Sequence, residues 1–393
     1  MFVENDKCFQ PSERANDKRH LPAIEVGRQN FSLNSLLFVL QRFKSSHEAD
    51  FKAAVAGAPP THVTELDNGV RVAVEESNSP VASVGIYVSV GSRYEDASNN
   101  GAANLLKRLH LKGTVKQAQA DLQNEIGSTG ARLNVNTSRE QTSITATCLP
   151  KHVPKVVEIL ADALQNPRLD EADIERSRNA ALLELQNTQD DLETVTFDYL
   201  HATAFQGTPL SQTIFGPTSN IKAINKQTLK NYIDIHYKAC RTVLAGAGDV
   251  SAKELTSLAE KNLGKLDNTF DGSPPVLSPC RFTSSDIRAR DDSLPLASFA
   301  FAVEGAGANS PDRVPLLVAA QIIGAWDRTQ NAGSNHSSAL AADSAKEGNF
   351  VQNLKHHLRS NSDQLQNFAT ASAPSASTTA IPVSGASMPL LNA

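Results

Sequence analysis

Cysteine, aromatic residues and long apolar runs are all scarce in this chain of 393 residues. Its four cysteines, Cys8, Cys148, Cys240 and Cys280, lie far apart and show no Cys-x-x-Cys spacing. This pattern excludes a dense disulfide scaffold and a zinc site built from cysteine pairs. The longest strongly apolar run near the N-terminus, residues 36–40, is much too short to cross a bilayer. Any contact with a membrane is therefore expected through a partner protein.

An excess of positive charge is also absent. The formal net charge is -5 and the isoelectric point is near 6.1, so the chain lacks the basic field that nucleic-acid binding requires. Hydrophobic residues at 40% and charged residues at 20% are typical of a globular protein. The length allows two domains, each with its own core.

Residues 1–60 read as a leader and linker. Between residues 27 and 46 there is no acidic residue, while Arg28, Arg42 and Lys44 lie among serines and leucines, as in a mitochondrial presequence. An acidic and mixed segment precedes them, whereas a presequence should begin at the terminus. A masked presequence and an ordinary surface helix of a leader both stay open.

Residues 61–266 predict one α+β domain, with helices on one face of a mainly antiparallel sheet. Residues 63–75 read as two strands joined through Asn68-Gly69, a strong hairpin signal. Alternating or helical periodicity predicts further strands at 81–90, 131–149 and 242–249, and helices at 102–111, 118–127, 153–165, 170–205 and 229–237.

The remainder of the chain predicts an incomplete second copy. Residues 267–279 form a proline- and glycine-rich linker, and strand-then-helix order begins again in 280–348. From residue 349 to 393 the chain becomes rich in serine, alanine and threonine, and we expect a divergent tail without a packed core. Half of a second domain leaves an apolar face uncovered, so a hetero-oligomer is expected.

Residues 91–114 carry the most informative motif. They run Gly-Ser-Arg-Tyr-Glu, then after three residues Asn-Asn-Gly-Ala-Ala-Asn-Leu-Leu-Lys-Arg-Leu-His-Leu-Lys-Gly-Thr. This stretch, with residues 130–142, 197–218 and 324–329, resembles the pitrilysin/insulinase superfamily of zinc peptidases and, within it, mitochondrial processing peptidase. Active members of that family carry an inverted His-x-x-Glu-His motif on a helix and a glutamate ligand some seventy-odd residues downstream.

The resemblance implies a degenerate metal site. Aligned without gaps, the first histidine position holds Asn104, the glutamate position Lys107 and the second histidine position Arg108, while Glu184 matches the downstream ligand. We therefore expect no catalytic residue, no metal and no cofactor. Their i, i+3, i+4 spacing predicts that Asn104, Lys107 and Arg108 share one helix face. Whether Lys107 or Arg108 pairs with Glu184, or the basic side chains extend to solvent, stays open.

His110 is the one nearby residue that could replace a lost ligand. It lies two positions beyond Arg108, so on a helix it faces elsewhere. We interpret it as a core or surface histidine.

Members of this superfamily with a degraded motif include the core subunits of mitochondrial ubiquinol–cytochrome c reductase, respiratory complex III. The resemblance implies a non-catalytic structural or assembly subunit on the matrix side of the inner membrane, bound to a second core subunit and other complex III subunits. Two alternatives are a β-type subunit of processing peptidase, a zinc endopeptidase, and a non-catalytic peptide-recognising pseudo-peptidase.

Overall fold

The computed structural model describes residues 57, 59–270, 277, 280–283, 285–291, 296–307, 310–323, 326–327, 338–346, 353–360 and 365–374. The predicted leader lies outside the described residues except for residues 57, 59 and 60. Most of the predicted linker and the end of the predicted tail also lie outside them.

The first part of the chain forms a six-stranded sheet. Its strands are β1 (Thr61–Glu65), β2 (Arg71–Glu76), β3 (Ala82–Val88), β4 (Arg132–Thr137), β5 (Thr142–Cys148) and β6 (Thr242–Gly248). Their order is β1-β2-β6-β3-β5-β4, and every pair is antiparallel except β2 with β6, which is parallel. The predicted α+β class with a mainly antiparallel sheet is confirmed.

One face of this sheet carries the core. In register across the strands, Val72 is opposite Leu244, Leu244 opposite Ile86, and Ile86 opposite Ile144. All four of these side chains are buried, whereas the alternate residues Ser83 and Thr145 face away from the core. Because side chains of a strand alternate between faces, this register collects the apolar set on the helix-covered face.

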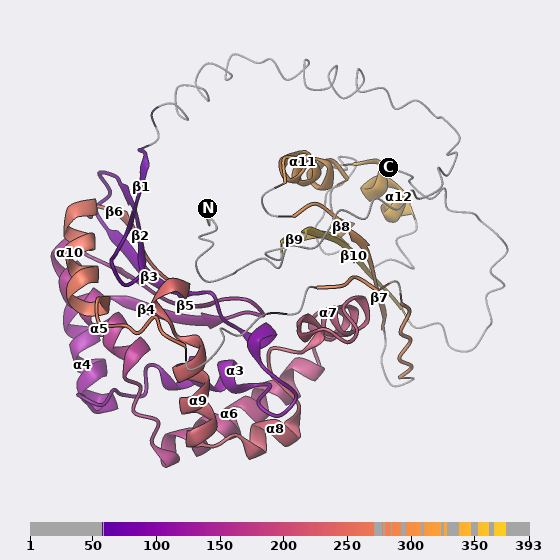
Figure 1. Ribbon diagram of the computed structural model, residues 1–393. Helices are drawn as coiled ribbons and strands as arrows, with labels where there is room; N and C mark the ends of the chain where they lie inside the picture. Colours follow the sequence, from indigo (N-terminus) through magenta and orange to yellow (C-terminus); the bar gives the residue numbers. More distant parts are fainter. Residues whose placement is uncertain are drawn as a thin grey trace, which may run out of the picture. The chain divides into compact units, whose positions relative to one another are not determined.

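Helices cover the buried face. The helices of this part are α3 (Ala102–Leu109), α4 (Gln119–Thr129), α5 (Val153–Gln165), α6 (Glu171–Gln189), α7 (Leu192–Ala204), α8 (Thr218–Ala223), α9 (Lys226–His236) and α10 (Ala252–Leu263). Helices α5 and α10 pack on the sheet and on each other, and α3 packs against β4, α6 and α9 (Figure 1). No helix among the described residues is long and apolar enough to cross a membrane.

Helix α10 packs closely on the sheet at Gly246. A Cβ atom at Gly246 of β6 would lie 2.7 Å from Leu255 Cδ2 of α10, closer than carbon atoms can pack. Gly246 therefore leaves room for Leu255 of α10, whereas Gly248 has a φ of 107° and lies against the backbone of Val81.

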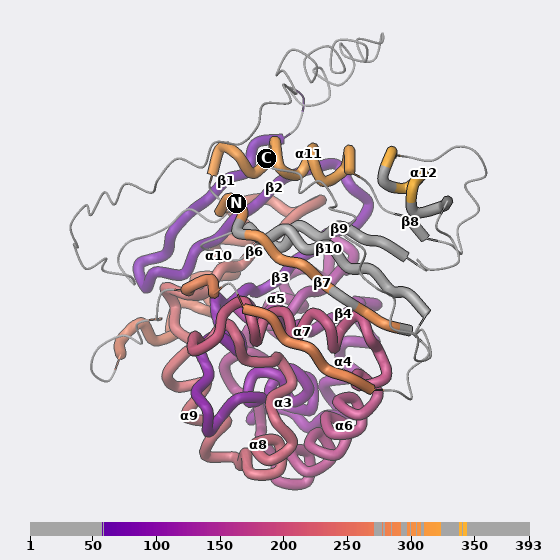
Figure 2. The backbone as a smooth tube through the Cα atoms, turned by 90° about the vertical axis from the view of Figure 1, so that its right-hand side faces the viewer, coloured from indigo at the N-terminus to yellow at the C-terminus, as the bar shows by residue number. Residues whose placement is uncertain are grey.

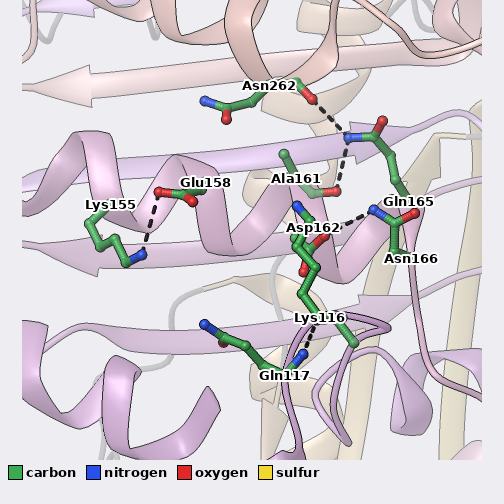
Figure 3. Close-up of polar contacts among 10 residues, drawn as sticks. Lys116, Gln117, Lys155, Glu158, Ala161, Asp162, Gln165, Asn166 and Asn262 are labelled. Atoms are coloured by element: carbon green, nitrogen blue, oxygen red, sulfur yellow. Dashed lines mark hydrogen bonds and ion pairs between the residues drawn. The ribbon is translucent and has the colours of Figure 1, made fainter. Parts of the chain in front are cut away.

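Polar contacts join the loop after α3 to α5 and α10. Lys116 Nζ lies 2.9 Å from Asp162 Oδ1, and Asn166 donates to the same carboxylate. Gln165 at the end of α5 donates to the carbonyl oxygens of Ala161 and Asn262, the latter on α10 (Figure 3). These bonds hold the C-terminal side of α3 against the rest of the layer of helices.

A second sheet follows the linker. It contains β7 (Leu296–Glu304), β8 (Trp326–Asp327), β9 (Asn353–Ser360) and β10 (Leu365–Pro374), in the order β7-β10-β9-β8. Strand β7 can be followed in Figure 2. Helices α11 (Arg313–Ile323) and α12 (Ala339–Lys346) belong to the same part of the chain.

Two segments of the predicted tail, residues 353–360 and 365–374, form strands that the sequence did not predict. Strand β10 pairs with β7 along its whole length and with β9 on its other side. Alanine, serine and threonine, which suggested low complexity, supply backbone groups for two ladders, and these ladders do not depend on large side chains.

A substitution of Ile86 tests which face of the sheet carries the core. Replacing Ile86 by alanine should lower the free energy of unfolding by about 2–5 kcal/mol, because the side chain is fully buried and a cavity remains. The matched control is Ser83→Ala, three residues earlier on the exposed face, which should change stability by about 0.5 kcal/mol or less. Denaturant unfolding of the purified variants gives both values, and equal losses would refute the assignment of faces.

Candidate functional site

The start of α3 is fixed by a buried carboxylate. Glu95 accepts hydrogen bonds from the backbone N–H of Ala103 at 2.7 Å, from that of Gly101 at 2.9 Å and from Asn100 Nδ2 at 2.7 Å. Burial raises the pKa of Glu95 to about 7, and these three hydrogen bonds oppose that rise. A carboxyl group at this end of a helix satisfies N–H groups that have no partner within the helix.

Gly101 gives the chain its entry angle into α3. Its φ of 107° lies in the region that favours glycine, and a Cβ atom there would meet the carbonyl oxygen of Phe215 at 2.7 Å. Tyr232 of α9 donates to the carbonyl oxygen of Gly91, just upstream. The first turn of α3 is therefore held by contacts from several segments.

The far end of α3 is held by His110. Its Nδ1 lies 3.0 Å from the carbonyl oxygen of Ala163, so Nδ1 must carry the proton, and Nε2 then accepts from the hydroxyl of Tyr237 at 3.1 Å. Complete burial lowers the pKa of His110 to about 4, which keeps the ring neutral at physiological pH. His110 is thus a hydrogen-bonded core residue, in agreement with the sequence-based interpretation.

The three motif positions lie on α3 between these two anchors. Asn104 is 1% exposed, and its Nδ2 has no hydrogen-bond partner among the described residues. Lys107 and Arg108 are partly buried. Desolvation lowers the pKa of Lys107, and the neighbouring charge of Arg108 lowers it further.

Glu184 reaches this face from α6. Arg108 Nη2 forms an ion pair with Glu184 Oε2, with 22% of the arginine side chain and 39% of the glutamate side chain exposed. Lys107 makes no ion pair with any residue that the structure describes. Of the pairings left open by the sequence, the structure therefore contains the one between Arg108 and Glu184.

The donor set here does not fit a zinc ion. Zinc in proteins is held by imidazole, thiolate and carboxylate groups, and of the four positions only Glu184 supplies one. At the positions that the sequence resemblance aligns with the ligands, arginine and lysine instead supply positive charge, which repels a cation in a partly buried site. Within the described part of the chain, no group of three or more His, Cys, Asp or Glu side chains is arranged to hold a metal.

A second polar cluster lies in a shallow depression between α4 and α5. Its charged groups are paired: Lys155 Nζ lies 2.5 Å from Glu125 Oε1, and Lys116 is bound to Asp162. Because cations and carboxylates neutralise one another, this depression offers no reactive group.

Sequence reasoning missed Glu95 as an organising residue. It was recognised only as part of the flanking motif. The available signal was a carboxylate six residues before Gly101, close enough in sequence to fold back on the first N–H groups of the helix.

Two family models match the sequence of this chain. Residues 71–218 match the model of insulinase, peptidase family M16, and residues 223–381 match the model of the inactive domain of peptidase M16. The chain belongs to the M16 peptidase family. Both types of domain of that family are represented in it.

Two groups of relatives have similar sequences. The β subunit of mitochondrial processing peptidase from Bos taurus is 49% identical over 307 residues, which is 78% of this chain and 62% of the relative. Subunit 1 of the mitochondrial cytochrome b-c1 complex is 46% identical over 295 residues in both Mus musculus and Homo sapiens, covering 75% of this chain and 62% of each relative. The chain thus spans about three-fifths of the length of these relatives.

Solved structures share the fold. A protease from Helicobacter pylori superposes with a TM-score of 0.72 at 19% identity, covering 80% of this chain and 76% of the protease. A chain of complex III₂ from Candida albicans gives 0.68 at 24% identity, covering 80% of this chain and 72% of that chain. At these identities the likeness shows the fold alone.

The buried imidazole of His110 predicts a pH-dependent contribution to stability. Its pKa is depressed from 6.5 to about 4, so the unfolded chain takes up a proton below pH 6.5 while the native ring stays neutral until about pH 4. The contribution of His110 to the free energy of unfolding is therefore complete above pH 6.5. It falls by roughly 3 kcal/mol as the pH decreases from 6.5 to 4.

The comparison of wild type with His110→Gln isolates this contribution. Glu95 and His236 also titrate in this range, but they are present in both proteins and cancel in the difference. The stability advantage of the wild type over His110→Gln should shrink as the pH falls from 7 to 4. Urea unfolding at several pH values measures it, and a constant difference would contradict a buried neutral His110.

Proposed function

We propose that this chain is a non-catalytic core subunit of mitochondrial respiratory complex III. The ion pair between Arg108 and Glu184 is the observation that carries the proposal. It occupies the place where the family motif would bring the second histidine ligand and the downstream glutamate ligand together. A guanidinium group there supplies a positive charge, but it cannot bind and activate a water molecule as a zinc ion does.

Loss of the motif affects both binding and catalysis. Peptide hydrolysis on zinc needs a metal-bound water and a carboxylate general base beside it. Lys107 stands at the position of the base, and a protonated amine has no lone pair with which to accept a proton. On this proposal the chain lacks the two histidine ligands and the general base of the family chemistry.

Sequence identity alone does not choose between the two groups of relatives. The values of 46% for cytochrome b-c1 complex subunit 1 and 49% for the processing-peptidase β subunit are too close to separate them. The residues at the motif positions favour the complex III subunit, because a zinc endopeptidase requires ligands that Asn104 and Arg108 do not provide. The β-type peptidase subunit remains the second candidate on the strength of the 49% identity.

Location and partners follow from the same proposal. A core subunit of complex III lies on the matrix side of the inner mitochondrial membrane and binds a second core subunit. The chain would then contact the membrane only through other subunits of the complex. We also infer that residues 61–266 form the first M16-type unit and that the second unit begins near residue 280.

The first test is co-migration. In mitochondria that express the chain with a C-terminal epitope, we expect the epitope to migrate with cytochrome-containing complex III on native gels after mild detergent extraction. The β subunit of processing peptidase, tagged in the same way, is the control for the soluble peptidase. Recovery of the chain with that peptidase, or as a separate matrix species, would count against the proposal.

The second test restores the motif. The triple variant Asn104→His, Lys107→Glu, Arg108→His should gain zinc binding, with Glu184 as the third ligand, while the wild type binds none measurably. Isothermal titration calorimetry gives the affinities, and the same triple variant with Glu184→Gln should bind at least about tenfold more weakly. Zinc-dependent cleavage of a presequence peptide by the wild-type chain would overturn the non-catalytic assignment.

A further inference from the structure

The face of α3 that carries Asn104, Lys107 and Arg108 has more hydrogen-bond donors than acceptors. Asn104 Nδ2 and Arg108 Nε are both buried and form no hydrogen bond with a described residue, and a buried acceptor in the same situation, Glu184 Oε2, is already ion-paired with Arg108 Nη2. Lys107 adds an ammonium group with no carboxylate partner in the same part of the chain. Buried donors without partners are rare in folded proteins, because each loses its hydration without replacement.

The charge of this face is also unbalanced. Arg108 and Lys107 contribute two positive charges, and Glu184, paired to Arg108, contributes one negative charge. The neighbouring charge of Arg108 adds to desolvation in lowering the pKa of Lys107. A net charge of +1 therefore stays on a partly desolvated surface.

Exposure varies along this face of α3. Asn104 is 1% exposed, whereas Arg108 and Glu184 retain 22% and 39% exposed side chains. A small group can therefore approach Lys107 from the side of Glu184, and it reaches Asn104 Nδ2 and Arg108 Nε only when side chains of this face shift, because both atoms are covered.

We propose that this face of α3 binds a carboxylate group, held by Lys107, Asn104 Nδ2 and Arg108 Nε. The site thus reverses the preference of the family motif, from a cation to an anion. A monoanion neutralises the excess charge, whereas a phosphate dianion would leave negative charge beside Glu184. Charge-assisted hydrogen bonds from the lysine and the guanidinium favour the carboxylate over water. The proposal concerns only these contacts and holds whichever assembly contains the chain.

Titration with sodium [1-¹³C]acetate tests the site in the full-length chain. At constant ionic strength, the ¹³C linewidth should report saturable binding, and inorganic phosphate should compete more weakly than unlabelled acetate. Lys107→Met should weaken acetate binding by about tenfold, and Lys107→Arg should retain it, because the positive charge is kept. The matched control Lys151→Met removes an exposed lysine from outside this face and should leave binding unchanged.

A second variant tests the buried donor. Asn104→Leu keeps the side-chain size but removes Nδ2, and we expect weaker acetate binding in a sample whose circular dichroism matches the wild type. Lys107 is partly exposed, so Lys107→Met keeps the test decisive even where Asn104→Leu does not fold. No saturable binding to the wild type, equal binding by Lys107→Met, or tighter binding of phosphate than of acetate would each overturn the proposal.

A pair of peptides distinguishes a carboxylate on a polypeptide from a small free carboxylate. A fluorescent peptide with one central glutamate and amidated ends should bind more tightly than its glutamine twin if the group belongs to a polypeptide. Equal binding of the two peptides, together with saturable acetate binding, would assign the site to a small free carboxylate. Either result supports a carboxylate site, and failure of both probes refutes it without bearing on co-migration with complex III.

Discussion

The hydrogen bonds of Glu95 to the first turn of α3 are the interaction on which the site geometry depends. They fix the residue at which the helix begins, and hence the direction in which each later side chain of α3 points. A shift of one residue would rotate every later side chain by about 100° about the helix axis. Asn104, Lys107 and Arg108 would then no longer face α6. The position of Glu184 opposite Arg108 thus follows from a carboxylate that lies outside the motif itself.

Much of the first sheet could be predicted from the sequence because its signals are local. Asn68-Gly69 between alternating residues indicated the hairpin that the structure shows as β1 and β2. Apolar spacing indicated α3 to within two residues of its observed end. The segment 170–205 was predicted as one long helical stretch, but it is divided into α6 and α7. Asp191 accepts from the N–H of Glu193 and begins the second of these helices, a capping signal that the periodicity concealed.

Other features could not be predicted because they depend on distant partners. Spacing placed Lys107 and Arg108 on one face, yet which of them meets Glu184 depends on how α3 crosses α6. The strands β9 and β10 were missed because their stability comes from pairing with each other and with β7. The local composition predicts such pairing poorly, because the hydrogen bonds between strands are formed by backbone groups.

The ion pair also gives a physical reason why Glu184 is present in a chain without the ligand histidines. A partly buried carboxylate with no cation beside it costs free energy, and Arg108 offsets that cost by pairing with Glu184. The two anchors of α3, Glu95 and His110, involve no metal, so the helix keeps its place whether or not zinc binds. Folding therefore accounts for Arg108 and Glu184 together. It does not account for Lys107, whose charge is desolvated beside another cation and satisfies no described carboxylate, and a bound anion is the simplest group that would balance it.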